Sequence, residues 1–275
     1  MSSIITSQGV IEIRELCGLP ELAAAERIQL DVWGQDTLPE GRELFQAIQH
    51  SGGLVAGAFA PSSELIGFIF AFPTRDPAVQ HSHRLAVRAE WRGARLGAAL
   101  KWFQRDWCLA RGITRVHWTV DPLRMPNAEL NVRILGATTR TYWPDYYGAM
   151  QGLDAGLPSD RFWMDWRLDS AHVAALAQTL PPDSGFADAQ PANRVLDNQP
   201  SDARPDLDAP SVLIRIPPNF VALSANDRAL AVAWRQHTRL LFQAYFARGY
   251  YVSAFTRLNG PAYRLDRDSD EGPQK

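Results

Sequence analysis

A stretch of arginines, glycines and other small residues carries the clearest chemistry in the chain. It reads Arg92-Gly93-Ala94-Arg95-Leu96-Gly97-Ala98 and follows a β-compatible run, Leu85-Ala86-Val87. The first N–H groups of a helix lack intrahelical partners, and the helix dipole favours negative charge beside them. Small residues let a phosphate approach these groups, and Arg92 adds a positive charge. The pattern therefore indicates an anion site, although an ordinary strand-to-helix turn would use glycine in the same way.

The elements around this stretch alternate between strand and helix patterns. A helical stripe follows it, formed by Leu100, Phe103, Trp107 and Ala110, and Gly112 stands where a C-cap glycine would end the helix. Upstream, periodicity and turn residues predict five elements before the run at 85–87: strand 10–14, helix 20–33, a segment 38–50 with Pro39 near a helix start, and a hairpin of strands 54–60 and 65–72.

Downstream of Gly112 the pattern continues with shorter elements. A β-rich run over 113–120 ends at Asp121-Pro122, because proline disfavours helix in the residue before it and interrupts a strand. A short helix is predicted over 127–135 with Gly136 at its cap, and two strands follow at 138–143 and 162–168.

The rest of the chain divides by composition. Six prolines and six aspartates lie in 181–210 without periodicity, which indicates a linker or long surface loop. A strand is predicted at 211–216 and a helix at 224–248, started by Ser224 with Asp227 in a capping-box arrangement. Two strands, 250–255 and 262–265, complete the prediction. We expect a domain over 1–170, a linker over 171–210, a small unit over 211–266 and a polar tail over 267–275.

The small C-terminal unit is marginal by itself at this size. We therefore expect it to pack on the main sheet or on a second subunit, which would make the protein a homodimer.

Composition excludes several classes of function. The 275 residues are 46% hydrophobic and 21% charged, with a formal net charge of −2, so no global basic field or basic aromatic patch indicates nucleic acid. Cys17 and Cys108 form no disulfide framework, and no His, Cys and carboxylate cluster has metal spacing. No leader or membrane-length apolar run is evident, so we expect a cytoplasmic protein without membrane or metal partners.

The loop and the element order together resemble the GNAT acyltransferase superfamily over residues 10–168. The family's acyl-CoA pyrophosphate loop has Arg or Gln, two residues, Gly, one residue, then Gly or Ala. Arg92 and Gly97 match this pattern, whereas Arg95 stands at the usual middle glycine, where it is tolerable if its φ is helical. The segments HSH (81–83), WTVDPL (118–123), NAELN (127–131) and LPSDR (157–161) resemble a predicted-acetyltransferase branch with a C-terminal extension.

The resemblance implies an α/β (α+β) fold of the GNAT type. Its mixed central sheet has splayed fourth and fifth strands and is flanked by helices, here with a small C-terminal βαβ extension. It also implies acetyl-CoA or another acyl-CoA as co-substrate, with the pantetheine arm on Leu85, Ala86 and Val87 and the pyrophosphate on the loop from Arg92 to Ala98. Asn127 and Asn131 lie one helical turn apart and could reach the pantetheine amides; the alternative is an N-cap and a core polar contact.

Acyl transfer to an amine needs a base, a group that polarises the carbonyl, and an acid or other stabiliser for the thiolate. His83 is the first candidate base, because its ordinary pKa lies near neutrality, unless it is only a hydrogen-bonded strand end. Asp121 is the second candidate, unless it caps the turn before Pro122. The resemblance implies that a backbone N–H at Val87 or its neighbour polarises the carbonyl.

The family's usual acid is a tyrosine four residues before the glycine that ends the fourth helix, and Val132 occupies that position here. Tyr142, Tyr146, Tyr147 or water could supply the proton instead, and we take Tyr147 as the candidate acid. We assign Tyr146 and Arg161 to substrate binding. Arg161 could hold a substrate carboxylate bidentately or form a surface ion pair.

The sequence thus predicts an acyl-CoA-dependent N-acyltransferase, using an acetyl or succinyl group, that acts on a small-molecule amine such as an amino acid. The alternative is a non-catalytic GNAT module that senses CoA or recruits a partner through its C-terminal unit. The missing tyrosine supports this alternative, and the intact loop argues against it.

Overall fold

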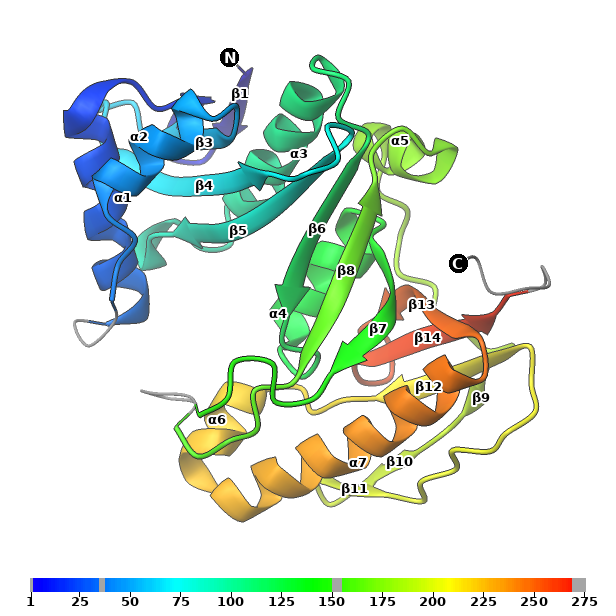
Figure 1. Ribbon diagram of the computed structural model, residues 1–275. Coiled ribbons are helices and arrows are strands. Elements are labelled where there is room, and N and C mark those ends of the chain that lie inside the picture. The colour runs from blue at the N-terminus through cyan, green and yellow to red at the C-terminus, as the bar shows by residue number, and fades with distance from the viewer. Residues whose placement is uncertain (1, 35–37, 150–154, 269–275) are drawn as a thin grey trace. The chain divides into compact units, whose positions relative to one another are not determined.

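The computed structural model describes residues 2–34, 38–149 and 155–268 as a mixed α/β protein with mostly antiparallel strand pairing (Figure 1). The chain divides into two compact units. One comprises Met1–Trp118 with Arg167–Ala177, and the other Thr119–Trp166 with Gln178–Lys275. The boundary therefore falls inside a strand near residue 118, not at the expected position near 170.

The first unit is built on an antiparallel sheet of consecutive strands. These are β1 (Ser2–Thr6), β2 (Gly9–Glu15), β3 (Leu54–Phe59), β4 (Leu65–Pro73) and β5 (Val79–Val87). Strand β1 was not predicted, because its short run carries no clear alternation and Ile5 is largely exposed. Strand β6 (Arg115–Val120) then joins β5 in parallel, which makes the sheet mixed.

Helices cover this sheet because alternate strand residues are apolar on each face. Phe68 and Phe70 of β4 pack in one core with α1 (Gly18–Trp33) and α2 (Arg42–His50). Gly67 precedes Phe68 on β4 and points to the opposite face, where it lies against Leu100 of α3 (Leu96–Leu109), so α3 packs on that face. Helix α2 begins after an extended Gly41 cap, so Pro39 precedes the helix and does not occupy its first turn.

The second unit contains the two strands that follow β6 in the chain, together with the C-terminal segment. Strand β8 (Arg161–Arg167) pairs with β7 (Thr138–Trp143), which contacts β13 (Tyr250–Thr256) through the pair Thr139 and Val252. The ladder continues through β14 (Ala262–Arg267), β12 (Ser211–Arg215) and β9 (Gln190–Pro191). Within this unit the C-terminal strands thus extend the ladder that β7 and β8 begin.

The long C-terminal helix differs from its prediction. It is split into α6 (Phe220–Asn226) and α7 (Arg228–Ala247) by Asp227, whose φ of −143° is extended. The Asp227 carboxylate accepts a hydrogen bond from the Leu230 N–H at 2.9 Å, so Asp227 is itself the N-cap of α7. The Ser224 hydroxyl instead donates to the Val221 carbonyl. A serine followed by an aspartate three residues later fits a helix start at either residue. In the structure the long helix starts after Asp227.

The expected linker over 171–210 contains regular structure. It forms α5 (Ala171–Gln178), β9 and the hairpin of β10 (Arg194–Leu196) and β11 (Gln199–Ser201). Asn193 is fully buried, and its side-chain amide bonds both the N–H and the carbonyl of Arg215. The proline-rich segment is therefore held in place along the second unit. Hydrogen bonds between its side chains and the backbone, such as those of Asn193, stabilise it in place of a periodic apolar face.

Candidate functional site

The predicted anion loop lies at the start of α3, after a short 3₁₀ turn at Ala89–Trp91. Gly93 adopts a φ of 87°, and nothing lies within 4 Å of the position that a Cβ would take there. Arg92, Gly93 and Arg95 are all exposed. The backbone of the loop is thus open to a ligand, and a positive φ at Gly93 explains why glycine stands at this position.

The first three residues of α3 are Leu96, Gly97 and Ala98, whose N–H groups precede the first intrahelical bond. That bond runs from the Ala99 N–H to the Arg95 carbonyl at 3.0 Å. The three donors, the helix dipole and the two arginine side chains of the loop favour a polyanion such as a pyrophosphate.

Arg95 corrects one expectation. Its φ of 58° and ψ of 19° place it in the left-handed region, so the helical φ that would make an arginine tolerable at this position is not found. Glycine would adopt that conformation without the steric cost that a side chain brings.

Strand β5 carries the residues assigned to the pantetheine arm. Leu85, Ala86 and Val87 pair with β4 on one edge, opposite Ile69, Phe68 and Gly67. On the other edge, within the described part of the chain, β6 pairs only with Val79, Gln80 and His81. The ladder between the two strands therefore ends before residue 85, which leaves the last residues of β5 outside it, as in a splayed pair.

His83 lies at a β-bulge. Arg84 pairs with Phe70 and Ser82 with the next residue, Ala71, so His83 is the additional residue on β5. Bulges bend a strand and redirect one side chain, and they are common next to active sites. No local pattern in the residues indicates this bulge, although His83 itself was predicted as a candidate base.

The environment of His83 keeps its imidazole neutral. Burial lowers its pKa below 6.5, and the neighbouring Arg84 charge lowers it further, while Glu40 opposes both. The His83 Nε2 lies 3.7 Å from Glu40 Oε1, and its ring packs against Phe70. His81 beside it is more strongly affected, with a pKa of about 4 that is due mainly to burial. A neutral imidazole at neutral pH can accept a proton, so His83 retains the properties of a base.

A polar network that we did not predict lies beneath β5. Lys101 of α3 donates from Nζ to Ser82 Oγ and Gln104 Oε1, each at 3.0 Å, and lies 3.8 Å from the Trp118 ring centroid. Burial lowers the pKa of Lys101 to about 7. The signal in the sequence was a lysine next to an apolar helical stripe in a chain with only one other lysine, Lys275.

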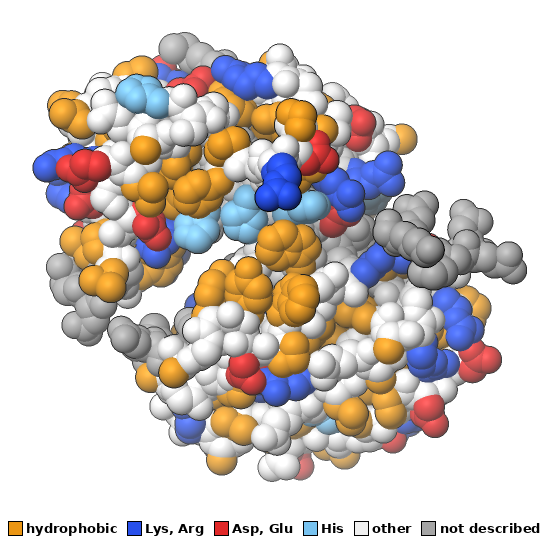
Figure 2. All heavy atoms as spheres, viewed as in Figure 1, with side chains coloured by type: hydrophobic (Ala, Val, Ile, Leu, Met, Phe, Trp, Pro, Cys, Tyr) orange, Lys and Arg blue, Asp and Glu red, His pale blue; other side chains and the backbone are white. Residues whose placement is uncertain are grey.

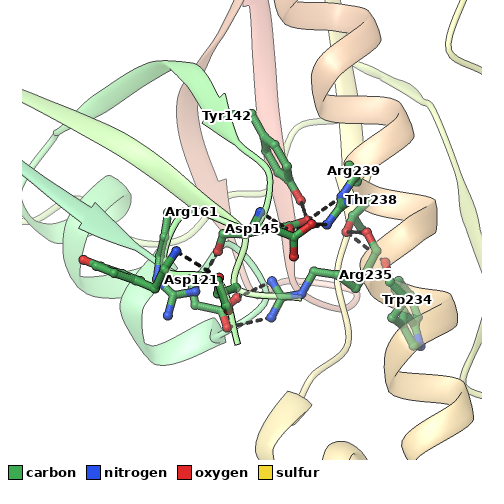
Figure 3. Close-up of polar contacts among 12 residues, drawn as sticks. Asp121, Tyr142, Asp145, Arg161, Trp234, Arg235, Thr238 and Arg239 are labelled. Carbon is green, nitrogen blue, oxygen red and sulfur yellow. Dashed lines mark hydrogen bonds and ion pairs between the residues drawn. The ribbon is translucent and has the colours of Figure 1, made fainter. Parts of the chain in front are cut away.

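Asp121, the second candidate base, belongs to the second unit and is held in a buried ion pair (Figure 3). Arg235 of α7 donates from both terminal nitrogens to the two carboxylate oxygens, at 2.7 and 2.8 Å. Burial alone would raise the pKa of Asp121, but the Arg235 charge and hydrogen bonds outweigh it and lower that pKa. A carboxylate held in this way is a poor proton acceptor, so this geometry argues against Asp121 as the base.

A second arginine of α7 holds another buried carboxylate (Figure 3). Arg239 donates to both oxygens of Asp160, and the Tyr142 hydroxyl donates to Asp160 Oδ2 at 2.5 Å. Burial and the Asp160 charge raise the pKa of Tyr142 well above 10. Tyr142 is therefore committed to this cluster, which argues against it as the acid. The sequence did not indicate Arg235 or Arg239 as partners, because they lie far along the chain.

Tyr146 and Tyr147 lie in the turn after β7. Their rings meet edge to face with centroids 4.7 Å apart, and the guanidinium of Arg161 lies 5.0 Å from the Tyr147 ring. The Tyr147 hydroxyl is 2.7 Å from Thr119 Oγ1. The structure thus brings together three residues that we assigned to catalysis and substrate binding: Tyr146, Tyr147 and Arg161.

Asn127 and Asn131 lie in a helix that changes its geometry. Helix α4 (Met125–Ala128) continues into a π-helix at Glu129–Ile134, where the Leu135 N–H bonds the Leu130 carbonyl. Since α4 starts at Met125, Asn127 is not its N-cap, which removes the first part of the alternative and leaves a core polar contact by Asn131 open. Asn131 is buried in the π-helix, a form often found at functional sites.

Metal-ligand clusters and membrane-spanning helices were also searched for in the described residues. Among residues 2–34, 38–149 and 155–268, no three His, Cys, Asp or Glu side chains are grouped so that they could hold a metal ion. In the same ranges, no helix has the length and hydropathy needed to cross a membrane. Figure 2 shows acidic, basic and hydrophobic side chains mixed over the visible surface.

Comparison with known proteins identifies the class. Residues 22–137 match the model of the Acetyltransferase (GNAT) family. No curated protein matches the chain. Among solved structures, the chain is similar to an N-acetyltransferase from Staphylococcus aureus Mu50, with 14% identity, 58% of this chain and 99% of that chain covered, and a TM-score of 0.49.

Two other structures are similar to the same extent. A phosphinothricin acetyltransferase from Sinorhizobium meliloti, in complex with AcCoA, has 18% identity, covers 65% of this chain and 96% of its own, and gives a TM-score of 0.48. The ribosomal-protein-S18-alanine N-acetyltransferase from Escherichia coli has 19% identity, covers 58% and 96%, and gives 0.48. The family assignment rests on the match over residues 22–137.

Residues 22–137 therefore match the GNAT acetyltransferase family, to which the loop and the element order showed a resemblance. Acyl-coenzyme A is the co-substrate that this class of enzyme uses. The matched residues contain the loop, β5 and His83, so the family and the geometry refer to the same part of the chain.

Proposed function

We propose that this protein transfers an acetyl or succinyl group from acyl-CoA to the amine of a small molecule, and we favour an amino acid as the acceptor. The observation that carries the proposal is the start of α3. There an open Gly93, two exposed arginines and the first helical N–H groups follow strand β5, whose last residues lie beyond its ladder with β6 in the described part of the chain. This is the arrangement that a pyrophosphate and an amide-bearing arm require.

In the proposed reaction the acceptor nitrogen attacks the thioester carbonyl, the C–N bond forms, and the C–S bond breaks. His83 takes the proton that the amine loses, since its imidazole is neutral at neutral pH. The thiolate of CoA leaves and takes a proton from Tyr147 or from water. Asn131 is proposed to bind the pantetheine arm together with Asn127, and Arg161 to bind a carboxylate of the acceptor.

Acetyl-CoA and succinyl-CoA differ in the charge of the acyl group. Succinyl-CoA carries an additional carboxylate that an arginine could bind, whereas acetyl-CoA needs no such contact. The test is thiol release from acetyl-CoA and from succinyl-CoA against a panel of amino acids and polyamines. Release that depends on one amine class supports the transferase and names its substrates.

One observation favours a second candidate, a CoA-binding sensor without catalysis. Val132 stands where the family usually has the tyrosine that acts as the acid, and a valine side chain has no hydroxyl that could donate a proton. No thiol release with any amine, together with a higher melting temperature in CoA, would favour the sensor over the transferase.

The loop itself can be tested with Gly97→Glu. A carboxylate at the second residue of α3 would repel the pyrophosphate, and we expect CoA binding to weaken by about a hundredfold, or ~2.7 kcal/mol. The measurement is calorimetric titration with CoA. Ala110→Glu adds the same charge at the other, exposed end of α3 and should leave binding unchanged. Normal CoA affinity in a folded Gly97→Glu variant would refute the loop assignment.

A further inference from the structure

The second unit contains a small pocket whose lining is almost entirely aromatic. It has a volume of about 320 Å³ and is lined by Thr141, Trp143, Tyr146 and Trp163. Ligand pockets begin at roughly 300 Å³, so this one fits a single ring or side chain and is too small for a large ligand. No charged side chain contributes to the lining.

Strand register explains why these side chains converge. Thr141 of β7 pairs with Trp163 of β8, so both point to the same face of the ladder. Trp143 follows Thr141 by two positions on β7 and shares that face. Two rigid strands therefore supply three of the four lining residues.

The fourth residue, Tyr146, is placed by a turn with several anchors. Its N–H donates to the Ser159 carbonyl at 3.2 Å, and the next N–H, of Tyr147, donates to Ser159 Oγ at 3.0 Å. The Ser159 hydroxyl in turn donates to the Gly148 carbonyl. Because Ser159 is buried, the turn is fixed from within the unit, and the pocket is formed before a ligand arrives.

The positive charge of Arg161 beside the pocket favours a neutral ligand group over a cationic one. Aromatic faces attract cations, but Arg161 is the cross-strand partner of Trp143, and its guanidinium already lies against Tyr147, next to Tyr146. A cationic group in the pocket would meet this like charge. A neutral planar group gains ring contacts without that penalty.

Trp143 and Tyr146 are 47% and 43% exposed, so two large aromatic surfaces remain available to a ligand. We propose that this pocket binds a planar aromatic side chain of the acceptor amine, which makes aromatic amino acids and related aromatic amines the substrate class. This inference rests on the proposed transferase function and goes beyond it by naming the acceptor.

The experiment measures acyl transfer to L-phenylalanine and L-alanine, with calorimetric binding of both amino acids in the presence of CoA. We expect a kcat/KM for phenylalanine at least about tenfold higher than for alanine. Trp143→Ala should remove this preference by raising KM for phenylalanine about tenfold, with alanine unaffected, and Trp143→Phe should retain most of it. Leu240→Ala, which truncates an exposed apolar residue on α7 outside the pocket, is the control and should change neither.

The outcomes separate the two proposals. Transfer to other amines without a preference for phenylalanine, or a Trp143→Ala effect equal for both amino acids, overturns the pocket assignment and leaves the transferase. Phenylalanine binding that Trp143→Ala abolishes, without transfer to any amine, supports the pocket and overturns the transferase. Absence of both binding and transfer overturns both.

Discussion

Arg95 departs from the family's loop pattern and has a left-handed backbone conformation. A non-glycine residue in the left-handed region is sterically disfavoured, and nothing about the arginine side chain requires that conformation. The conformation is instead imposed by the turn from the 3₁₀ segment into α3. The strain therefore belongs to this position and should be removable.

Arg95→Gly should raise the free energy of unfolding by about 1 kcal/mol, because glycine adopts a φ of 58° without the steric cost. Chemical denaturation measures this change. Arg92→Gly is the matched control, since Arg92 has an ordinary φ of −65° and the same loss of charge. If Arg95→Gly is as destabilising as Arg92→Gly, Arg95 does not adopt the left-handed conformation.

His83 provides a second prediction at the scale of one residue. Its pKa lies below 6.5, so the neutral base form already predominates at pH 7, and kcat/KM should rise with pH below neutrality and then level off. Glu40 raises this pKa, so Glu40→Gln should move the acidic limb to lower pH. His83→Gln should lower kcat by about 10²–10⁴ and abolish that limb. A pH profile unchanged in both variants would exclude His83 as the base.

At the scale of elements, α3 and β5 are joined by a polar network in an apolar interior. Gln104 Nε2 donates to Gln80 Oε1 at 2.7 Å, and the Cys108 thiol donates to the same oxygen at 3.2 Å. Lys101 completes the network with its bonds to Ser82 and Gln104. The helix that begins with the anion loop is thus fixed in position against the strand assigned to pantetheine.

Because Lys101 is buried in this network, the free energy of unfolding should depend on pH. Its folded pKa of about 7 lies below the value of 10.5 in the unfolded chain, so folding discourages protonation. The resulting cost is fully present below pH 7 and is relieved as pH rises towards 10.5. The stability of the native protein relative to Lys101→Met should therefore increase by about 2 kcal/mol between pH 7 and pH 9. Denaturation curves at the two pH values measure it, and a constant difference would show that Lys101 is not buried.

The elements also show what the sequence could and could not predict. The loop, β5 and α3 were identified because glycine positions and helical periodicity are local signals. The break between α6 and α7 was missed, because Ser224 and Asp227 fit a cap in two registers. The bulge at His83 depends on how β4 and β5 align, which neither strand encodes by itself.

At the scale of the whole molecule, the missed features are contacts between distant parts of the chain. The turn-cap alternative for Asp121 is confirmed, because its Oδ1 accepts a hydrogen bond from the Leu123 N–H at 2.9 Å. Its ion pair with Arg235 was missed, because that partner lies 114 positions away. The same reasoning placed a domain boundary at 170, although residues after 178 supply the arginines and rings that the strands before 166 bury. Spacing patterns identify local elements but not the pairing of distant charges.

Because of these contacts, we expect a chain that ends at Gln178 not to fold cooperatively. Phe162 would lose Phe242, whose ring centroid lies 4.7 Å from its own, and Asp121 would be left as a buried charge without Arg235. Removing one partner of a buried ion pair costs about 3–5 kcal/mol, a large part of the 5–15 kcal/mol typical of a whole protein.

Thermal unfolding followed by circular dichroism tests this expectation, with Arg235→Met in the full-length chain as the comparison. That variant should lose about 3–5 kcal/mol but still unfold in one transition, and adding Asp121→Leu should restore most of the loss, since an apolar pair can replace a buried ion pair. A chain ending at Gln178 with a sharp transition and intact CoA binding would show that the first 178 residues form an independent domain. The ion pairs of α7 would then stabilise the C-terminal segment without being needed for the fold that binds CoA.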